Sequence, residues 1–177
     1  MNDDESFSGM LNGAKRRTQS VTADWTILQD LIDGVRVKEI RSVIKNNGYL
    51  TEIYRADWQL DSRPVDQVFQ VVLNPGEIEA WHVHSQTVDR FFVCQGRMKI
   101  VLYDAREESP THGRINEFRL GSARSGIVSV PPGVWHGVQN IGDVASIMIN
   151  LVDHAYVYEK PDHWGLPAGS ALIPYCF

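Results

Sequence analysis

Four side chains in two short segments of this chain could together bind a metal ion or move protons. The first segment holds His82, His84 and Asp89, and the second holds His136 directly after the sequence Pro-Pro-Gly-Val-Trp. Consecutive side chains of a strand point to opposite faces, so His82 and His84 share one face if residues 81–85 are extended. Imidazole and carboxylate groups bind divalent metals, and a neutral imidazole is also a general base.

The second segment is the more specific of the two. Pro131, Gly133, His136 and Asn140 form the pattern Pro-x-Gly-x-x-His-x-x-x-Asn, which a random chain of this composition would contain about 0.001 times. The His-x-His pair alone is far more common by chance. Finding both segments in order, each flanked by turn residues, favours a shared site.

Short runs rich in β-branched and aromatic residues, separated by Gly, Pro and Asn, follow one another from residue 35 onward. They predict strands over 38–44, 49–55, 67–73, 78–83, 90–94, 97–104, 115–120, 126–130, 137–140 and 145–152. Many closely spaced strands favour a closed or nearly closed β-barrel that brings the two segments together. Alternation also directs Trp81 and Trp135 to the outside of that barrel, where they would contact a second subunit.

The N-terminal part has a different pattern. Residues 1–20 are polar and without periodicity, which predicts a loose arm, and residues 21–177 form a single domain. Residues 23–33 carry apolar side chains at helical spacing before a glycine, so they predict a short helix, with a strand as the alternative.

Composition limits the partners of the chain. A net charge of −5 gives no electrostatic reason to bind nucleic acid or a membrane surface, so we expect a small ligand. The two cysteines do not form a disulfide framework. The N-terminus lacks the basic start and apolar stretch of a signal peptide, which predicts a cytoplasmic protein.

The two site segments resemble the two sequence motifs of the cupin superfamily, whose fold is a double-stranded β-helix, or jelly-roll barrel. The resemblance therefore implies an all-β fold with both motifs on facing strands. In one interpretation, the side chains of His82, His84, Asp89 and His136 bind a divalent metal such as Zn, Mn, Fe or Ni.

A closer resemblance is to the deoxysugar-nucleotide epimerases typified by dTDP-4-dehydrorhamnose 3,5-epimerase. It covers residues 35–174 and is carried by segments 47–58, 108–120 and 131–137, of which Ser-Pro-Thr-His-Gly-Arg at 109–114 is the most specific. The resemblance implies an isomerase that needs no cofactor and acts on a keto deoxysugar linked to dTDP. A base removes a proton next to the C4 ketone, and an acid returns one on the opposite sugar face.

By position, the resemblance makes His82 the base, Tyr156 the proton donor and Arg90 the cation that stabilises the enolate. Three other positions contact the substrate: His136, Asn150 and Glu79. Glu79 replaces an arginine that meets the diphosphate in the family, and Asn150 replaces a tyrosine. His84 replaces a glutamine, and the aspartate that orients the base is absent after Trp164-Gly165.

The residues also leave alternatives open. One is a metal-dependent cupin of another class, such as a dioxygenase or a small-molecule-binding protein, which would use the three histidines and Asp89. Another is a sugar-binding descendant without activity. In each case we expect a homodimer formed through the N-terminal strands, because long exposed strands invite edge pairing.

Overall fold

The computed structural model describes residues 9–24 and 28–177. The chain divides into two compact units, Met1–Asp30 and Leu31–Phe177, and every named strand lies in the second. The expected division between residues 1–20 and 21–177 stays a prediction. Within the described ranges, no helix has both the length and the apolar character needed to cross a lipid bilayer.

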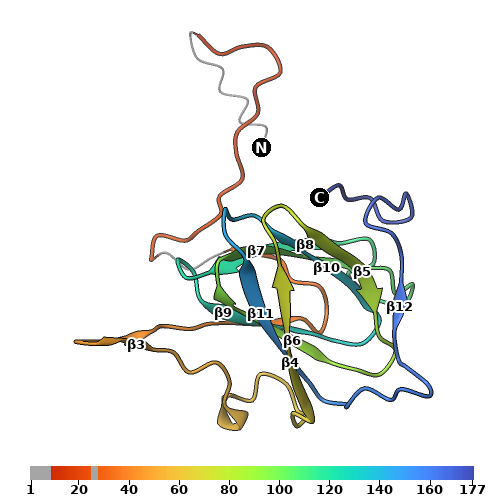
Figure 1. Ribbon diagram of the computed structural model, residues 1–177. Coiled ribbons are helices and arrows are strands. Elements are labelled where there is room, and N and C mark those ends of the chain that lie inside the picture. The colour runs from red at the N-terminus through yellow and green to blue at the C-terminus, as the bar shows by residue number, and fades with distance from the viewer. Residues whose placement is uncertain (1–8, 25–27) are drawn as a thin grey trace. The chain divides into compact units, whose positions relative to one another are not determined.

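The second unit contains two five-stranded antiparallel sheets, shown in Figure 1, so the predicted all-β class is confirmed. One sheet has the order β1-β9-β6-β11-β4 and the other the order β12-β5-β10-β7-β8, while β2 and β3 form a separate hairpin. The elements are β1 Arg36–Glu39, β2 Val43–Lys45, β3 Gly48–Leu50, η1 Ala56–Trp58, β4 Gln67–Leu73, β5 Ile78–Val83, β6 Asp89–Gln95, β7 Arg97–Asp104, β8 Ile115–Gly121, β9 Gly126–Val130, β10 Val134–Asn140, β11 Ser146–Val152 and β12 Trp164–Gly165.

The predicted strands 67–73, 78–83, 97–104 and 126–130 have the observed bounds. The expected strand 38–44 is instead divided between β1 and β2, and the expected strand 49–55 ends at Leu50. Strand β10 begins at Val134, three residues earlier than expected, because the turn before it needs only Pro131 to Gly133. Gly133 has φ +79°, a conformation that glycine adopts without steric cost.

The helix expected over 23–33 falls partly on residues 25–27, which lie outside the described residues. Residues 28–33 form no helix. The backbone N–H of Ile32 donates to Asn116 Oδ1 at 2.9 Å, and that of Asp33 donates to Thr111 Oγ1 at 2.8 Å. These amides therefore bind side chains of β8 and of the loop before it rather than carbonyls of a helix, and Ile32 is buried in the core.

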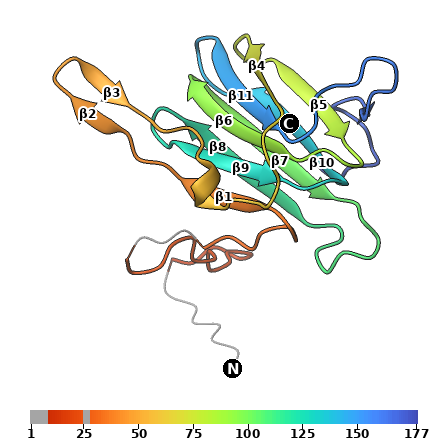
Figure 2. The same ribbon diagram turned by 90° about the horizontal axis from the view of Figure 1, so that it is seen from below.

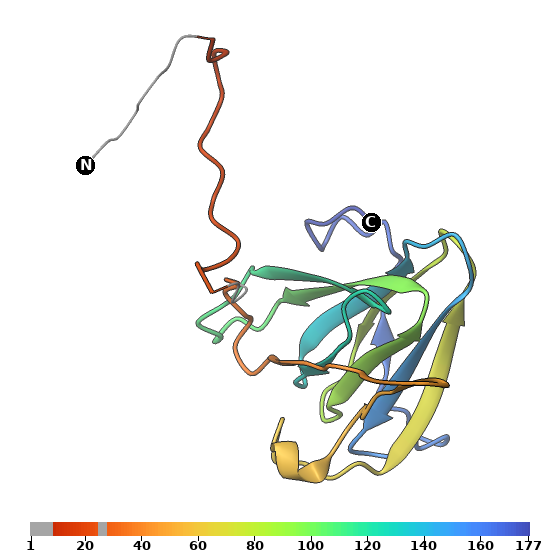
Figure 3. The ribbon, with the colours of Figure 1, turned by 90° about the vertical axis from the view of Figure 1, so that its left-hand side faces the viewer.

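The main core lies between the two sheets and is built from inward-facing apolar side chains, among them Phe91, Met98, Phe118 and Met148. Figure 3 shows the second unit from the side, with β4 and β11 adjacent along one sheet. This packing of two apolar faces fixes the sheets against each other and leaves polar side chains at one end to form a site.

A second apolar cluster corrects the expectation for the tryptophans. Trp81 is fully buried, and its ring lies 5.0 Å from Phe177 and 6.1 Å from Tyr175. Ile173 and Trp135 pack in the same cluster. The C-terminal segment of the same chain therefore covers the outer face of β5, which we had expected a second subunit to contact.

Arg90 is a buried cation that anchors the loop between η1 and β4. Its side chain has no exposed surface and donates to both carboxylate oxygens of Asp61, with 2.7 Å from Nε to Oδ2. Ser129 Oγ donates to the same carboxylate at 2.9 Å, and Arg90 Nη2 donates to the Arg63 carbonyl at 2.9 Å. A buried guanidinium destabilises the fold unless a carboxylate partner balances its charge.

We expect Asp61→Asn to lower the free energy of unfolding by about 3 kcal/mol, because it leaves a buried charge without its partner. Urea denaturation followed by circular dichroism measures this change. The control is Asp57→Asn, which removes an exposed ion pair with Arg55 and should leave the midpoint close to that of the wild type. Equal midpoints for the two variants would contradict a supporting role for the buried pair.

Candidate active site

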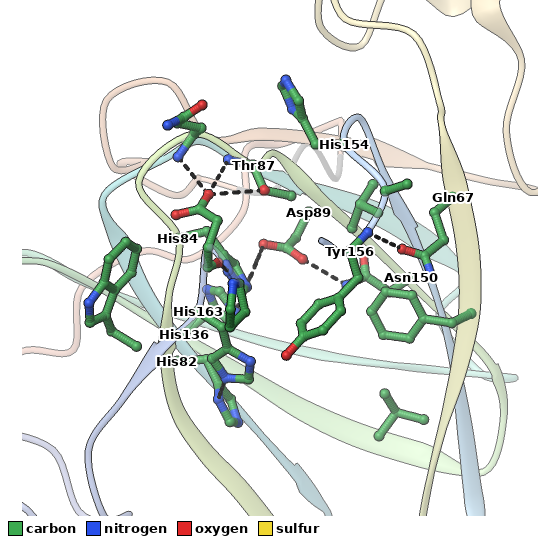
Figure 4. Close-up of a pocket in the computed structure, with 18 of the residues that line it drawn as sticks. Gln67, His82, His84, Thr87, Asp89, His136, Asn150, His154, Tyr156 and His163 are labelled. Carbon is green, nitrogen blue, oxygen red and sulfur yellow. Dashed lines mark hydrogen bonds and ion pairs between the residues drawn. The ribbon is translucent and has the colours of Figure 1, made fainter. Parts of the chain in front are cut away.

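A cavity of about 830 Å³ opens between strands of the two sheets and the segment that follows β11 (Figure 4). Its lining includes seven of the eight residues predicted for the site: Glu79, His82, His84, Asp89, His136, Asn150 and Tyr156. Two sequence segments about 50 residues apart therefore contribute to one wall, as the β-barrel prediction required.

Strand pairing explains how the histidines meet. Strands β5 and β10 are antiparallel neighbours, and His82 and His136 are directly opposite each other in their register. The next residue, Gly137, allows this close approach, because a Cβ there would lie 2.4 Å from the Cβ of Ala80. Asp89 begins β6 in the facing sheet, so the cluster is assembled from both sheets.

His84, His136 and Asp89 form a compact group whose ligand atoms lie within 4.8 Å of one another. The Nδ1 atoms of both histidines face carbonyl oxygens, of Asp162 for His84 and, at 3.2 Å, of Val134 for His136. A carbonyl only accepts, so Nδ1 carries the hydrogen and Nε2 of the neutral ring presents a lone pair. These Nε2 atoms lie 3.6 and 3.9 Å from Asp89 Oδ2, too far for hydrogen bonds.

The carboxylate of Asp89 is held in place from its other side. Asn150 Nδ2 donates to Asp89 Oδ1 at 2.7 Å, and Asn150 Oδ1 accepts from the backbone N–H of Arg90 at 3.1 Å. Asp89 Oδ2 is therefore the oxygen directed at the two imidazoles. Burial lowers the pKa of His136 to about 4, which keeps its ring neutral at pH 7.

His82 differs from the other two histidines in its partner. Its Nδ1 lies 2.7 Å from Nε2 of His163, and the two ring centroids are 4.8 Å apart. Its Nε2 is buried and has no hydrogen-bond partner among the described residues, since Glu79 Oε1 lies 3.8 Å away. Burial, followed by the neighbouring rings of His163 and His84, lowers the pKa of His82.

Asp162 and His163 are the functional residues that the sequence analysis missed. The carboxylate of Asp162 accepts hydrogen bonds from the backbone N–H groups of Ser85, Gln86 and Thr87, at 2.8, 2.9 and 3.1 Å. Burial raises its pKa, but these hydrogen bonds together hold the pKa below its usual range. The sequence carries no signal for them, because Trp164-Gly165, which pairs with β5 and brings them to the site, is a strand of only two residues.

The remaining predicted residues lie apart from the compact group. Figure 4 shows the ring of Tyr156 extending toward the histidines from the segment after β11. Arg90 is not brought into the cavity: strand alternation sends its side chain to the opposite face of β6 from Asp89, into the ion pair with Asp61. Of the predicted metal ligands, His82 is outside the group that His84, Asp89 and His136 form.

Comparisons with known proteins identify the family of this chain. Residues 44–164 match the model of the polysaccharide biosynthesis C-terminal domain family. The chain is 34% identical to a probable low-salt glycan biosynthesis epimerase of Haloferax volcanii over 77% of this chain and 88% of that relative.

Two solved structures share the fold. A dTDP sugar isomerase of Desulfovibrio desulfuricans is 28% identical with a TM-score of 0.76, over 81% of this chain and 90% of that one. A dTDP-4-dehydrorhamnose 3,5-epimerase of Bacillus anthracis is 19% identical with a TM-score of 0.74, over 85% of this chain and 88% of that one. These matches confirm the jelly-roll fold and do not favour a metal-dependent cupin of another class. The chain thus belongs to the polysaccharide biosynthesis C-terminal domain family and is an epimerase with the cupin fold.

Proposed function

We propose that this chain epimerises a keto deoxysugar linked to dTDP, with His82 as the base and Tyr156 as the acid. The observation that carries the proposal is the placement of both side chains along one cavity, His82 on β5 and Tyr156 on the segment after β11. The dTDP sugar isomerase that shares this fold supplies the substrate class to test first.

The proposed reaction moves one proton on each sugar face. His82 Nε2 takes the proton from a carbon next to the C4 ketone, and the electron pair of that C–H bond moves to the ketone oxygen to form an enolate. Tyr156 then donates its hydroxyl proton to the other face of the same carbon, and the C=O bond re-forms. The centre is inverted, and the lowered pKa of His82 keeps the base neutral before the reaction.

The charge on the enolate needs a partner other than Arg90, which Asp61 binds outside the cavity. Lys160 is the one lysine or arginine among the residues lining the cavity, all of which are described. We therefore assign Lys160 as a contact for the substrate's negative charge and Glu79 and Asn150 as contacts to the sugar; His136 is a sugar contact only when its Nε2 holds no metal.

We further propose that His84, Asp89 and His136 form a divalent metal site within the same cavity. Two imidazole nitrogens and a carboxylate oxygen converge there, and these are ligand types that divalent cations prefer. In such sites the ligating imidazole donates its other N–H to a carbonyl, and both rings face a carbonyl oxygen through Nδ1, while Asn150 fixes the carboxylate. A bound divalent metal would polarise a carbonyl oxygen of the substrate.

A homodimer is the third proposal, and the hairpin of β2 and β3 supports it. Figure 2 shows this hairpin extending away from the two sheets, and among the described strands β2 and β3 pair only with each other. Its apolar side chains are 45–78% exposed, namely Val43, Ile44, Tyr49 and Leu50. An isolated two-stranded hairpin is marginally stable, and an exposed apolar patch of this kind marks an interaction surface, which we assign to a second copy. A cytoplasmic location stays a prediction.

We expect the wild-type chain to exchange the protons at C3 or C5 of dTDP-4-keto-6-deoxyglucose with D₂O, measured by NMR. His82→Gln should slow both exchange and inversion by about 100-fold or more, because the base is lost. Tyr156→Phe should slow inversion more than exchange, since His82 can still remove and return a proton on one face.

The matched control for both variants is His112→Gln, whose ring lies outside the cavity and should leave both rates unchanged. Wild-type exchange no faster than that of His82→Gln would refute the epimerase proposal for this substrate.

We expect about one divalent metal ion per chain in protein purified without an affinity tag, by inductively coupled plasma mass spectrometry. His84→Ala should lose most of it, because one of three ligands is removed, and His112→Gln should retain it. Metal-free wild-type protein that also fails to bind added Zn²⁺ in calorimetry would rule out the metal site.

We expect light scattering to give twice the chain mass at micromolar concentration. Ile44→Lys should shift the protein to the monomer mass, because it places a charge on the apolar face of the hairpin. Val144→Lys is the control, since Val144 is similarly exposed but lies in the turn between β10 and β11. A monomeric wild type, or two variants with equal masses, would argue against this interface.

A further inference from the structure

The hydrogen bond between His82 and His163 joins the proposed base to a second imidazole. We propose that His163 is a positioning residue: it accepts the Nδ1 hydrogen of His82 and thereby makes Nε2 the basic nitrogen in the cavity. The inference rests on the proposed function of His82, and it adds a residue that contacts the base rather than the substrate.

The contact is short and specific. His82 Nδ1 lies 2.7 Å from His163 Nε2, and the rings meet edge to face at 67°. Only one hydrogen fits between two neutral imidazole nitrogens, so two arrangements are possible. Either His82 donates and its Nε2 is basic, or His163 donates and the Nε2 of His82 carries a hydrogen.

The surroundings of His82 favour the first arrangement. Its Nε2 is buried without a hydrogen-bond partner in the described part of the chain, and the nearest carboxylate oxygen, Glu79 Oε1, is 3.8 Å away. A hydrogen on Nε2 would therefore be a buried donor without an acceptor, which is more costly than an empty lone pair. His163 is exposed, so solvent is available to the hydrogen on its own Nδ1.

The backbone around His163 is built to hold the ring in place. Strand β12 pairs with β5, and Gly165 is directly opposite His82 in that register. His163 precedes Gly165 by two residues, so strand alternation places its side chain on the same side as that of His82. The preceding Asp162 is fixed by its hydrogen bonds to Ser85, Gln86 and Thr87.

Asp162 and His163 thus orient both histidines of the His-x-His pair. The Asp162 carbonyl accepts from Nδ1 of His84, and His163 accepts from Nδ1 of His82. Each imidazole is left with Nε2 as its free nitrogen. Within the described ranges no carboxylate contacts Nδ1 of His82, so an imidazole takes the place of the aspartate that orients the base in the epimerases this chain resembles.

Kinetics on the full-length chain test this role. We expect His163→Ala to lower kcat for proton exchange about 10-fold or more while KM stays within about 2-fold, because the substrate contacts remain. His163→Gln should restore most of kcat, since its side-chain oxygen reaches the same place and accepts the same hydrogen. His112→Gln again serves as the control.

NMR of histidine-labelled protein measures the tautomer of His82 directly and does not depend on turnover. Long-range ¹H–¹⁵N spectra at pH 7.5, assigned with His82→Gln, should show a protonated Nδ1 and an unprotonated Nε2 for His82 in the wild type. His163→Ala should give a mixture of both tautomers.

Three results would overturn the inference: a hydrogen on Nε2 of His82 in the wild type, an unchanged kcat in His163→Ala, or a lowered kcat that His163→Gln does not restore. If the wild type shows no exchange at all, the epimerase proposal fails, while the NMR spectra still decide the positioning role.

Discussion

The antiparallel pairing of β5 with β10 is the constraint on which the site depends. It places His82 directly opposite His136, and the absence of a side chain at Gly137 lets the strands approach beside them. The partner sheet then contributes Asp89 and Asn150 from β6 and β11. A one-residue shift of β5 would turn His82 out of the cavity, and the same shift of β10 would turn His136 out of it.

The two faces of β5 have different surroundings, and both serve the site. On the inner face, the imidazole of His82 is partly exposed and lines the cavity. On the outer face, Trp81 is sealed under the C-terminal segment through Ile173, Tyr175 and Phe177. A strand held by apolar packing behind it can carry polar groups in front without losing its position. Burial lowers the pKa of His82 on this strand and that of His136 on the neighbouring β10.

The sequence predicted the strands and the four convergent side chains well, because alternation and turn residues are local signals. It placed Arg90 in the site by resemblance, although strand alternation from Asp89 already pointed the two side chains to opposite faces. It could not find His163, since the contact with His82 depends on a two-residue strand, β12, that is too short to leave a periodic pattern. The most specific similarity, Ser109 to Thr111, proves to be structural: both hydroxyls donate to the buried carboxylate of Asp104.

The tight fit at Gly137 also limits how this site can diverge during evolution. A Cβ there would lie 2.4 Å from Ala80 and 2.9 Å from the ring of Phe177, so larger residues are barred from the wall beside His136. We therefore expect new substrate preferences in descendants of this chain to arise among residues 154–160, where the side chains are exposed and those other than Tyr156 and Lys160 are free to vary.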